Sequence, residues 1–264
     1  MKLLTLNCHS WQEENQFEKI KTLAETIKEQ SYDVIALQEV SQKKDSAEMI
    51  DGLRVDNFVV VLLQELEKMG VTDYHFTWDF SHIGFEIYEE GLAILTKHPI
   101  KKTHSFFITQ SHDTDYWKTR KIVGATIQYH DEFLSFYSCH LGWWGDDEEP
   151  YQYQVESLIN AADKEGTRYF LMGDFNNDAN TRNEGYDELV SKGIYDTYHL
   201  ALEKDSGATV KGKIQGWDEN NRDLRIDLIL ASNSFEVVKS NVIFNGENKP
   251  VVSDHYGLNL DVNV

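Results

Sequence analysis

The order of the predicted elements indicates an α/β (α+β) protein in which two packed mixed sheets are flanked by helices. Strand-like segments are frequent, helical segments lie between some of them, and other strands follow one another directly. The stretch His130-Asp131-Glu132, for example, has the composition of a hairpin turn between two strands. A purely parallel sheet needs a crossover after every strand, so hairpins and helices together favour two sheets.

The predicted strands are rich in β-branched, aromatic and aliphatic residues, which favour a pleated, half-buried backbone. In chain order they cover residues 3–8, 33–38, 75–80, 92–96, 105–109, 122–129, 133–140, 169–173, 225–231, 236–244 and 257–262. Only three prolines occur, and each fits a loop or the start of an element, because proline cannot donate a hydrogen bond within a sheet.

Three helices are indicated by apolar residues that recur three or four positions apart. The stripes are Phe17, Ile20, Ala24 and Ile27; then Val59, Leu62, Leu63, Leu66 and Met69; then Val155, Leu158, Ile159 and Ala162. Gly70 and Gly166 follow the second and third stripes as stop signals. Such stripes are normally buried, so we expect all three in the core.

The chain of 264 residues contains no repeat and no linker rich in proline, glycine or serine. We therefore expect one domain over residues 1–264. Its apolar fraction of 41% and charged fraction of 27% are ordinary for a globular protein with a large core. No apolar run reaches about 18 residues, and the N-terminal run is too short for a signal peptide. The expectation is a cytoplasmic protein without a membrane partner.

The protein is strongly acidic, because 25 basic and 45 acidic residues give a formal net charge of −20. Long-range repulsion makes extended duplex DNA a disfavoured partner. A compact anionic substrate is still compatible with this charge if a metal ion supplies local positive charge. The only cysteines, Cys8 and Cys139, are expected to be reduced core residues.

Several apolar segments lead directly into an acidic, amide or imidazole side chain. These groups are Asn7, Gln38-Glu39, His140 in Ser-Cys-His-Leu, Asp174 and Asn176 in Gly-Asp-Phe-Asn, Asp227 in Arg-Ile-Asp, and Asp254-His255 in Ser-Asp-His. Burying any one alone would cost several kcal/mol, whereas several together can satisfy one another around a cation. Their oxygen donors suit Mg²⁺ or Mn²⁺ better than zinc. The oxygen donors are Asn7, Glu39, Asp174, Asn176 and Asp254.

This ordered set resembles the motifs of the endonuclease/exonuclease/phosphatase superfamily, which includes pancreatic-type deoxyribonuclease, inositol-polyphosphate 5-phosphatases and neutral sphingomyelinases. The motifs run from residue 7 to residue 255, so the resemblance covers nearly the whole chain. It implies a four-layer α/β/β/α sandwich. It also implies a hydrolase of phosphoric esters that depends on Mg²⁺ or Mn²⁺.

By this resemblance, Glu39 is the principal metal ligand, and Asn7 and Asp254 lie on the metal side with it. The alternative for Glu39 is a solvated carboxylate, although Gln38-Glu39 closes a fully apolar strand. The alternative for Asn7 is a turn-forming residue.

The resemblance places Asp174, Asn176, Asp227 and His255 in catalytic positions. Asp174 and Asn176 would face the attacking water and a phosphate oxygen, unless they only form an Asp-x-Asn turn. Asp227 would pair with His255 and raise its basicity, unless His255 is a satisfied core histidine. Asp174 and His255 are both candidates for the base that activates water.

The resemblance also assigns His140 to the leaving-group side as general acid. Its family partner is an acidic residue before a glycine-rich strand, and Glu90 in Glu-Glu-Gly-Leu-Ala occupies that position. Arg120, which precedes the central hairpin, resembles a phosphate-contacting arginine; the alternative is a surface charge.

The loops beyond these motifs bear on the substrate. Trp143 and Trp144 follow His140, and flat aromatic faces suit sugar rings or lipid headgroups, although such rings also pack against loops. The acidic run 146–149 is expected to form a solvated loop; the alternative is a place near the cleft mouth, where it would repel flanking phosphates. Segments 7–14 and 140–144 resemble those of bacterial maltose 6′-phosphate phosphatases.

The leading hypothesis is therefore an intracellular phosphatase whose substrate is a small phosphorylated sugar. The alternative is a phosphodiesterase, either an endonuclease or exonuclease on DNA or a sphingomyelinase-like phospholipase. A non-catalytic binding module is the third hypothesis, and the filled catalytic positions argue against it.

Overall fold

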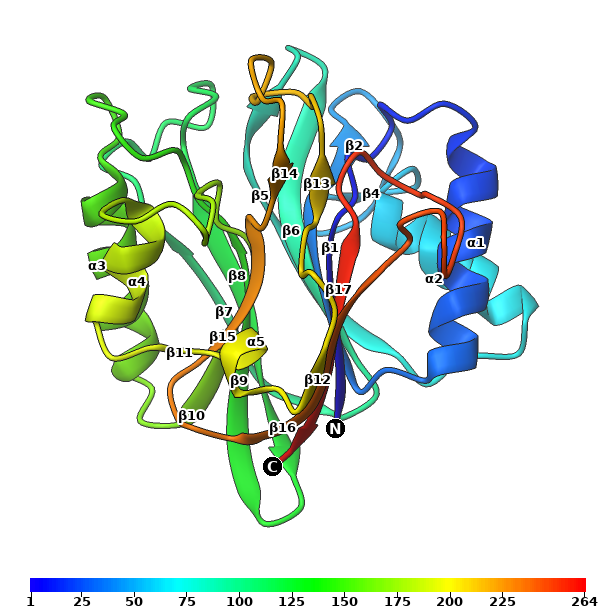
Figure 1. Cartoon of the computed structure of the whole chain (residues 1–264). Helices are drawn as coiled ribbons and strands as arrows, with labels where there is room; N and C mark the ends of the chain where they lie inside the picture. The colour runs from blue at the N-terminus through cyan, green and yellow to red at the C-terminus, as the bar shows by residue number, and fades with distance from the viewer.

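The computed structural model describes residues 1–264 and consists of two β-sheets that face each other, with helices outside both (Figure 1). Helices α1 (Gln16–Gln30) and α2 (Phe58–Lys68) cover one sheet, and α3 (Tyr151–Asp163) and α4 (Gly185–Ser191) cover the other. A single turn, α5 (Thr197–Leu200), packs against strands near the opposite edge from the site described below. The layers are therefore α/β/β/α, which confirms the predicted fold class.

The first sheet has seven strands. They are β1 (Lys2–Asn7), β2 (Val34–Lys43), β5 (His75–Gly84), β6 (Tyr88–Thr96), β12 (Glu203–Lys204), β16 (Glu236–Ile243) and β17 (Gly257–Asn263). Their order in space is β12-β16-β17-β1-β2-β6-β5. The sheet is mixed, because β1 runs parallel to β2 and antiparallel to β17.

The second sheet has six strands. They are β7 (Ile100–Phe107), β8 (Lys121–Tyr129), β9 (Glu132–His140), β10 (Arg168–Asp174), β11 (Tyr195–Asp196) and β15 (Asp227–Ala231), in the order β11-β15-β10-β9-β8-β7. It is also mixed, with β9 and β10 parallel. Two small hairpins stand apart from both sheets: β3 (Glu48–Ile50) with β4 (Leu53–Arg54), and β13 (Val210–Lys211) with β14 (Asp223–Leu224).

Three apolar clusters fill the spaces between the layers. One lies between the sheets, and each of the other two lies between a sheet and its helices. Strand β1 shows the alternation: Leu3 packs between the sheets, whereas Leu4 packs with Ile20 and Ile27 of α1. Burial of both faces explains why so many strands read as continuous apolar runs.

Every predicted strand and helix overlaps an observed element, but one predicted core residue is wrong. Phe17 is 68% exposed in the first turn of α1, where its ring lies edge-on to Trp11 at 5.8 Å. Helices α4 and α5 and the shortest strands escaped prediction because they are too short to show periodicity. Cys8 and Cys139 are free and buried, as expected. No helix combines the length and apolar character needed to cross a membrane.

Strand pairing brings the polar motif residues to one edge of the sheets. Asn7, at the end of β1, lies opposite Gln38 in the parallel strand β2, where the pairing between these two strands ends. In the other sheet, Asp174 lies opposite both His140 and Asp227. Because parallel strands end at the same edge, residues distant in sequence meet there.

Gly173 precedes Asp174 at a point where β10 comes very close to β9. Its φ is +150°, and a Cβ atom there would lie 2.0 Å from the carbonyl oxygen of Cys139. No side chain fits so close to backbone, so glycine is what allows the strand to bring Asp174 beside His140.

We expect Gly173→Ala to lower the free energy of unfolding by about 3 kcal/mol, because the methyl group forces the two strands apart. Urea denaturation followed by circular dichroism measures the loss. Gly193→Ala is the matched control: its φ is +83°, yet nothing lies within 4 Å of its Cβ position. It should lose only about 1 kcal/mol from backbone strain, and equal losses would show that the close approach is not the constraint.

Candidate active site

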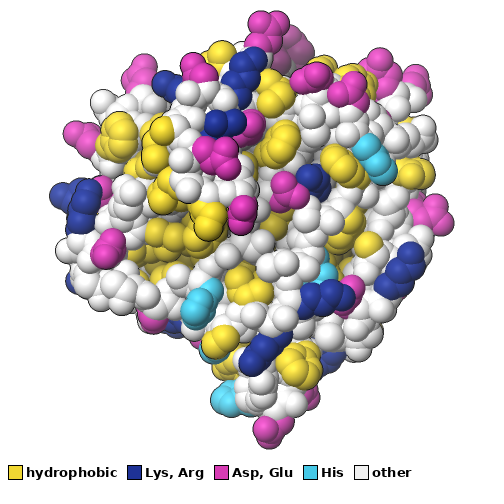
Figure 2. All heavy atoms as spheres, turned by 180° about the vertical axis from the view of Figure 1, so that it is seen from behind, with side chains coloured by type: hydrophobic (Ala, Val, Ile, Leu, Met, Phe, Trp, Pro, Cys, Tyr) yellow, Lys and Arg dark blue, Asp and Glu magenta, His cyan; other side chains and the backbone are white.

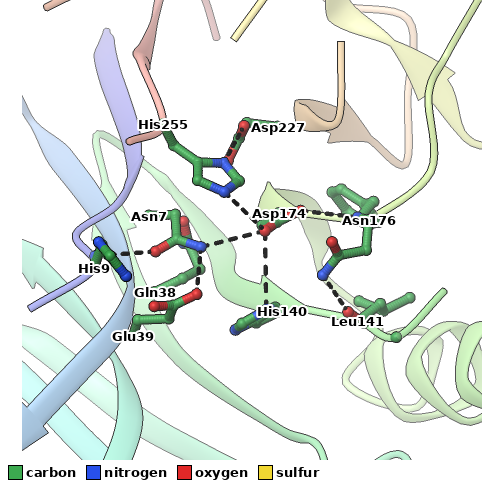
Figure 3. A network of polar contacts seen from close by, with 12 residues as sticks. Asn7, His9, Gln38, Glu39, His140, Leu141, Asp174, Asn176, Asp227 and His255 are labelled. Atoms are coloured by element: carbon green, nitrogen blue, oxygen red, sulfur yellow. Dashed lines mark hydrogen bonds and ion pairs between the residues drawn. The ribbon is translucent and has the colours of Figure 1, made fainter. Parts of the chain in front are cut away.

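The carboxylate of Asp174, at the end of β10, is the group on which both sheets converge (Figure 3). Its Oδ2 accepts a 3.2 Å hydrogen bond from Asn7 Nδ2 at the end of β1. The same Asn7 amide donates to Glu39 Oε1 at 2.8 Å. On the other side, the backbone N–H of Asn176 donates to Asp174 Oδ1 at 2.8 Å. Asn7 therefore joins carboxylates that come from opposite sheets.

Two imidazole rings approach the same oxygen from different strands. Nε2 of His140 and Nε2 of His255 each lie 3.8 Å from Asp174 Oδ2. The far nitrogen of His255, Nδ1, is 2.9 Å from Oδ2 of the fully buried Asp227 (Figure 3). Asp227 thus fixes the orientation of the His255 ring, because the carboxylate accepts the Nδ1 proton.

The two rings differ in charge. Burial opposes the charged form of His255, but the carboxylates of Asp227 and Asp174 outweigh it and raise the pKa of His255 well above its ordinary value. Burial, together with the positive charge of Arg120, lowers the pKa of His140 well below its ordinary value. His255 is therefore a charged ring between carboxylates, whereas His140 is neutral in the free protein.

Glu39 reaches this cluster through an irregularity in β2. The pairing register with β6 shifts between Leu37 and Val40, and Glu39 has a φ of +51°. Asn176 also has a positive φ, of +50°. Each such conformation costs about 1–3 kcal/mol and persists only where the surrounding structure enforces it. The bulge at Glu39 directs its side chain toward Asn7 rather than into the core.

A cavity of about 450 Å³ opens beside these groups. Four carboxylates and four histidines line it, together with the aromatic rings of Phe85, Trp117 and Trp143. Arg120 is the only lysine or arginine in the lining. Its Nη1 donates to the Trp117 carbonyl at 3.1 Å, and its guanidinium lies 5.9 Å from the Trp143 ring. Its Nε has no partner, so a hydrogen-bond donor remains for an anion.

The carboxylates repel one another. Burial, followed by repulsion from Glu39, raises the pKa of Glu90 to about 8. Burial also raises the pKa of Asp174 to about 7; Asp227 and Glu39 add to the shift, and His255 opposes it. With all of these carboxylates ionised, the site would carry more negative charge than its own basic groups compensate, and a bound cation would favour that ionised state.

His9, Glu13 and Asp254 form a second group of titratable side chains at the edge of the cavity. His9 Nδ1 lies 2.7 Å from Glu13 Oε1 and 3.7 Å from Asp254 Oδ1. Burial opposes the charged ring, but Glu13, Asp254 and Glu39 raise the pKa of His9 to about 9. The protonated His9, together with Lys19, which pairs with Glu13 Oε2, already balances the two acids of this trio, so we assign no separate metal to it.

The sequence model of the Endonuclease/Exonuclease/phosphatase family matches residues 5–255. The chain belongs to this family. An endonuclease/exonuclease/phosphatase family protein from Leptotrichia buccalis C-1013-b is 41% identical over 100% of both chains, with a TM-score of 0.94.

Two more distant structures show the fold alone. A mannosyl-6-phosphatase from Bacteroides thetaiotaomicron VPI-5482 is 17% identical over 100% of both chains, with a TM-score of 0.72. A humanized D. rerio TDP2 is 16% identical with a TM-score of 0.64, over 100% of this chain and 99% of that chain. No curated protein matches the sequence.

In this endonuclease/exonuclease/phosphatase family member, most of the predicted site residues surround one cavity. Those that line it are Glu39, Glu90, Arg120, His140, Trp143, Asp174, Asn176, Asp254 and His255. Asn7 and Asp227 lie directly behind them, bonded to Asp174 and His255. The expected convergence is present in the structure, and the role of each residue stays a prediction.

The predicted pairing of Glu90 with His140 is wrong in this structure. Glu90 Oε1 instead lies 3.5 Å from Nε2 of the buried His82, and no hydrogen bond or ion pair joins Glu90 to His140. The cause is a register shift between Phe80 and His82 in β5, which sets His82 directly opposite Glu90.

The predicted wall of two tryptophans is half correct. Trp143 lines the cavity, but Trp144 packs toward α3 with its ring 6.2 Å from Tyr151. Trp144 lines a smaller neighbouring cavity of about 260 Å³ instead. Residues 143 and 144 lie in the loop after β9, where side chains have no regular alternation, and only Trp143 reaches the site.

Three of the four residues in the acidic run 146–149 have partners in neighbouring segments, so the run is not a free loop. Lys118 Nζ lies 2.7 Å from Asp146 and 2.5 Å from Glu148. Glu149 is buried and accepts backbone hydrogen bonds from residues 110 and 111. The run therefore holds the loop that carries Trp117 against the loop that carries Trp143.

Sequence analysis missed His9, His82 and the pair Gln215-Gly216 as cavity residues. His9 follows the Asn7 motif by two positions, so proximity along the chain was a usable signal. His82 follows a bulge in β5, and the hydrophobic pattern of the sequence does not indicate this bulge. The pair at 215 lies in a polar loop whose sequence gives no sign of where it folds.

We expect Arg120→Gln to weaken the binding of inorganic phosphate at least about tenfold, because the cavity loses its only guanidinium. Isothermal titration calorimetry with phosphate measures the dissociation constant. Arg222→Gln is the control, since Arg222 is exposed and pairs with Asp178 outside the cavity. Unchanged phosphate affinity in Arg120→Gln would leave Arg120 with only its contacts to Trp117 and Trp143.

Proposed function

We propose that the protein is a divalent-metal-dependent phosphatase that hydrolyses the phosphomonoester of a small phosphorylated sugar, of the maltose 6′-phosphate kind. The observation that carries the proposal is the cavity, which joins the buried Asp174, His140 and His255 to the indole rings of Trp143 and Trp117. A volume of about 450 Å³ suits a small organic molecule. Flat indole faces beside polar groups suit a sugar ring.

The charge of the protein supports a compact substrate. The net charge is −20, and on the face seen in Figure 2 lysine and arginine side chains are scattered among acidic ones without a broad basic surface. Binding of extended duplex DNA relies on such a surface. The Bacteroides thetaiotaomicron neighbour is named a mannosyl-6-phosphatase, so one protein with this fold is described as acting on a phosphorylated sugar.

The residues at the site fit a hard divalent cation. Glu39, Asn7 and Asp254 would hold it, and all three offer oxygen atoms, as Mg²⁺ or Mn²⁺ prefers. Glu39 has the Asn7 amide as its side-chain hydrogen-bond partner, and its charge destabilises the ionised forms of the nearby Glu90 and Asp174. When bound, the ion neutralises phosphoryl oxygens and stabilises the departing oxygen.

The protein's own groups divide the remaining work. Arg120 and the charged His255 hold phosphoryl oxygens, and the Asn176 amide orients another. Of the two candidate bases for the attacking water, Asp174 fits better, because the charged His255, 3.8 Å away, already carries its proton. His140 would donate its ring proton to the leaving oxygen, because a dianionic phosphate beside it favours the protonated ring.

The purified protein with Mg²⁺ is expected to release phosphate from mannose 6-phosphate and maltose 6′-phosphate. Glu39→Gln and His255→Asn should each lower kcat/KM by about 10³-fold, because each removes a group that acts on the phosphoryl charge. Glu14→Gln should keep wild-type activity, since Glu14 is exposed. A phosphate-release assay measures all four proteins.

The same preparation is tested on abasic DNA, nicked DNA and sphingomyelin. We expect kcat/KM for these diesters to be far below that for the sugar phosphates. Comparable efficiency on DNA or sphingomyelin would establish the phosphodiesterase alternative. Near-normal turnover by Glu39→Gln or His255→Asn would overturn the assignment of the site.

Metal binding has a readout that does not depend on activity. Mg²⁺ or Mn²⁺ at about 100 times its dissociation constant should raise the melting temperature by about 5 °C, because the ion binds only the folded state. Glu39→Gln should abolish the shift, and Glu14→Gln should retain it. A full shift in Glu39→Gln, measured by differential scanning fluorimetry, would exclude Glu39 as the principal ligand.

A further inference from the structure

The loop between β13 and β14 crosses the open side of the cavity with the segment Gln215–Trp217, which we call the strap. At one end, Gln215 Oε1 lies 3.4 Å from His9 Nε2 on the wall formed by the first sheet. At the other end, Trp217 Nε1 donates a 3.2 Å hydrogen bond to Asn176 Oδ1. The strap therefore bridges the two walls of the cavity, and Gln215 and Gly216 both line it.

Gly216, in the middle of the strap, lies directly against the indole of Trp143. Its φ is +80°, and a Cβ atom there would be 2.8 Å from Trp143 Cζ2. Only a residue without a side chain lets the strap approach the ring so closely. The Trp143 face and the strap backbone thus form adjoining surfaces at the same side of the cavity.

The strap is anchored by a small core of its own. Trp217 and Ile214 pack against Val210, Leu224 and Ile226, which form an apolar cluster separate from the three main ones. At the base of the loop, the backbone N–H of Tyr256, next to His255, donates to the Thr209 carbonyl at 2.7 Å. In Figure 1 the hairpin β13/β14 stands between the two sheets. The strap is therefore held in place next to the catalytic edge.

The bond from Trp217 fixes a residue that faces the reaction. Asn176 Nδ2 donates to the Leu141 carbonyl at 2.9 Å, and its Oδ1 accepts from Trp217. With both ends of the amide held, the orientation of the second Nδ2–H bond is determined. Trp217 is thus a positioning residue that acts through Asn176.

We propose that the strap determines the substrate class of this site: it admits a terminal phosphomonoester whose leaving group is a small sugar, and it excludes a diester that continues past the phosphorus. The inference rests on the proposed phosphatase function. Its physical basis is that the strap links His9 to Asn176 and adjoins Trp143, so this side of the cavity has less room for a second ester arm. The wall that remains is polar at Gln215 and flat at Trp143, which matches a sugar ring.

Gly216→Ala tests the strap against a matched control. The added methyl group must push the strap off Trp143, so KM for mannose 6-phosphate should rise about tenfold. Because the diester gains access, kcat/KM for bis(p-nitrophenyl) phosphate should itself rise about tenfold, so the ratio of kcat/KM for mannose 6-phosphate to that for the diester should fall about a hundredfold. A diester kcat/KM that stays at the wild-type value would overturn the strap proposal. Gly212→Ala lies in the same loop with a φ of +73° and nothing within 4 Å of its Cβ position, so both values should stay within about twofold of wild type.

Trp217→Phe separates positioning from packing. The phenyl ring keeps most of the apolar contact but loses the N–H donor, so kcat should fall about tenfold while KM for mannose 6-phosphate changes less than about threefold. A change in KM alone would show that Trp217 only packs and does not position Asn176.

The outcomes keep the two proposals apart. If wild-type protein releases phosphate from no monoester, the proposed function fails. If wild type is active but Gly216→Ala keeps the wild-type ratio of monoester to diester turnover, the strap proposal fails and the proposed function stands.

Discussion

The buried carboxylate of Asp174 is the constraint on which the arrangement of the site depends. A charge in that position would be strongly unfavourable alone, so it needs partners from several directions. Asn7 contacts it from one sheet, and His140 and Asn176 contact it from the other. His255 lies just before the last strand, β17, and its ring is near the same carboxylate. Two sheets must therefore pack in one relative position, and the core between them supplies the energy that holds this position.

The electrostatics of the site follow from this crowding. Each carboxylate that faces the cavity raises the free energy of its neighbours, and the site offers only Arg120 and protonated histidines in return. Such a site is less stable than an apolar one of the same shape, and the bulge at Glu39 adds backbone strain. The arrangement makes chemical sense when a cation and a phosphoryl group complete it, because both relieve charge that the protein alone leaves unbalanced.

The sequence predicted the positions of site residues that lie at strand ends. It did not predict the contacts of residues whose position depends on a bulge or a loop. Asn7, Asp174 and His140 were found because each ends an apolar strand. Regular strand pairing then brings these strand ends together. Glu90 was given the wrong partner because one extra residue in β5 brings His82 opposite to it. Trp144 was misplaced because a loop after a strand has no fixed alternation. Local register shifts cost too little to leave a signal in composition or periodicity.

Under the proposed function, residues at strand ends carry out the reaction, whereas residues in loops select the substrate. Groups on strand ends are held by two sheets, so their geometry can stay constant while loops that cross the cavity change which molecule fits. In this protein the two are linked at one hydrogen bond, from Trp217 in the strap to Asn176 in the site. Under the proposed function, a substrate that contacts the strap and Trp143 would meet an Asn176 amide already oriented for phosphate. A substrate that displaces the strap loses this orientation, so poor fit lowers the rate of reaction as well as the affinity.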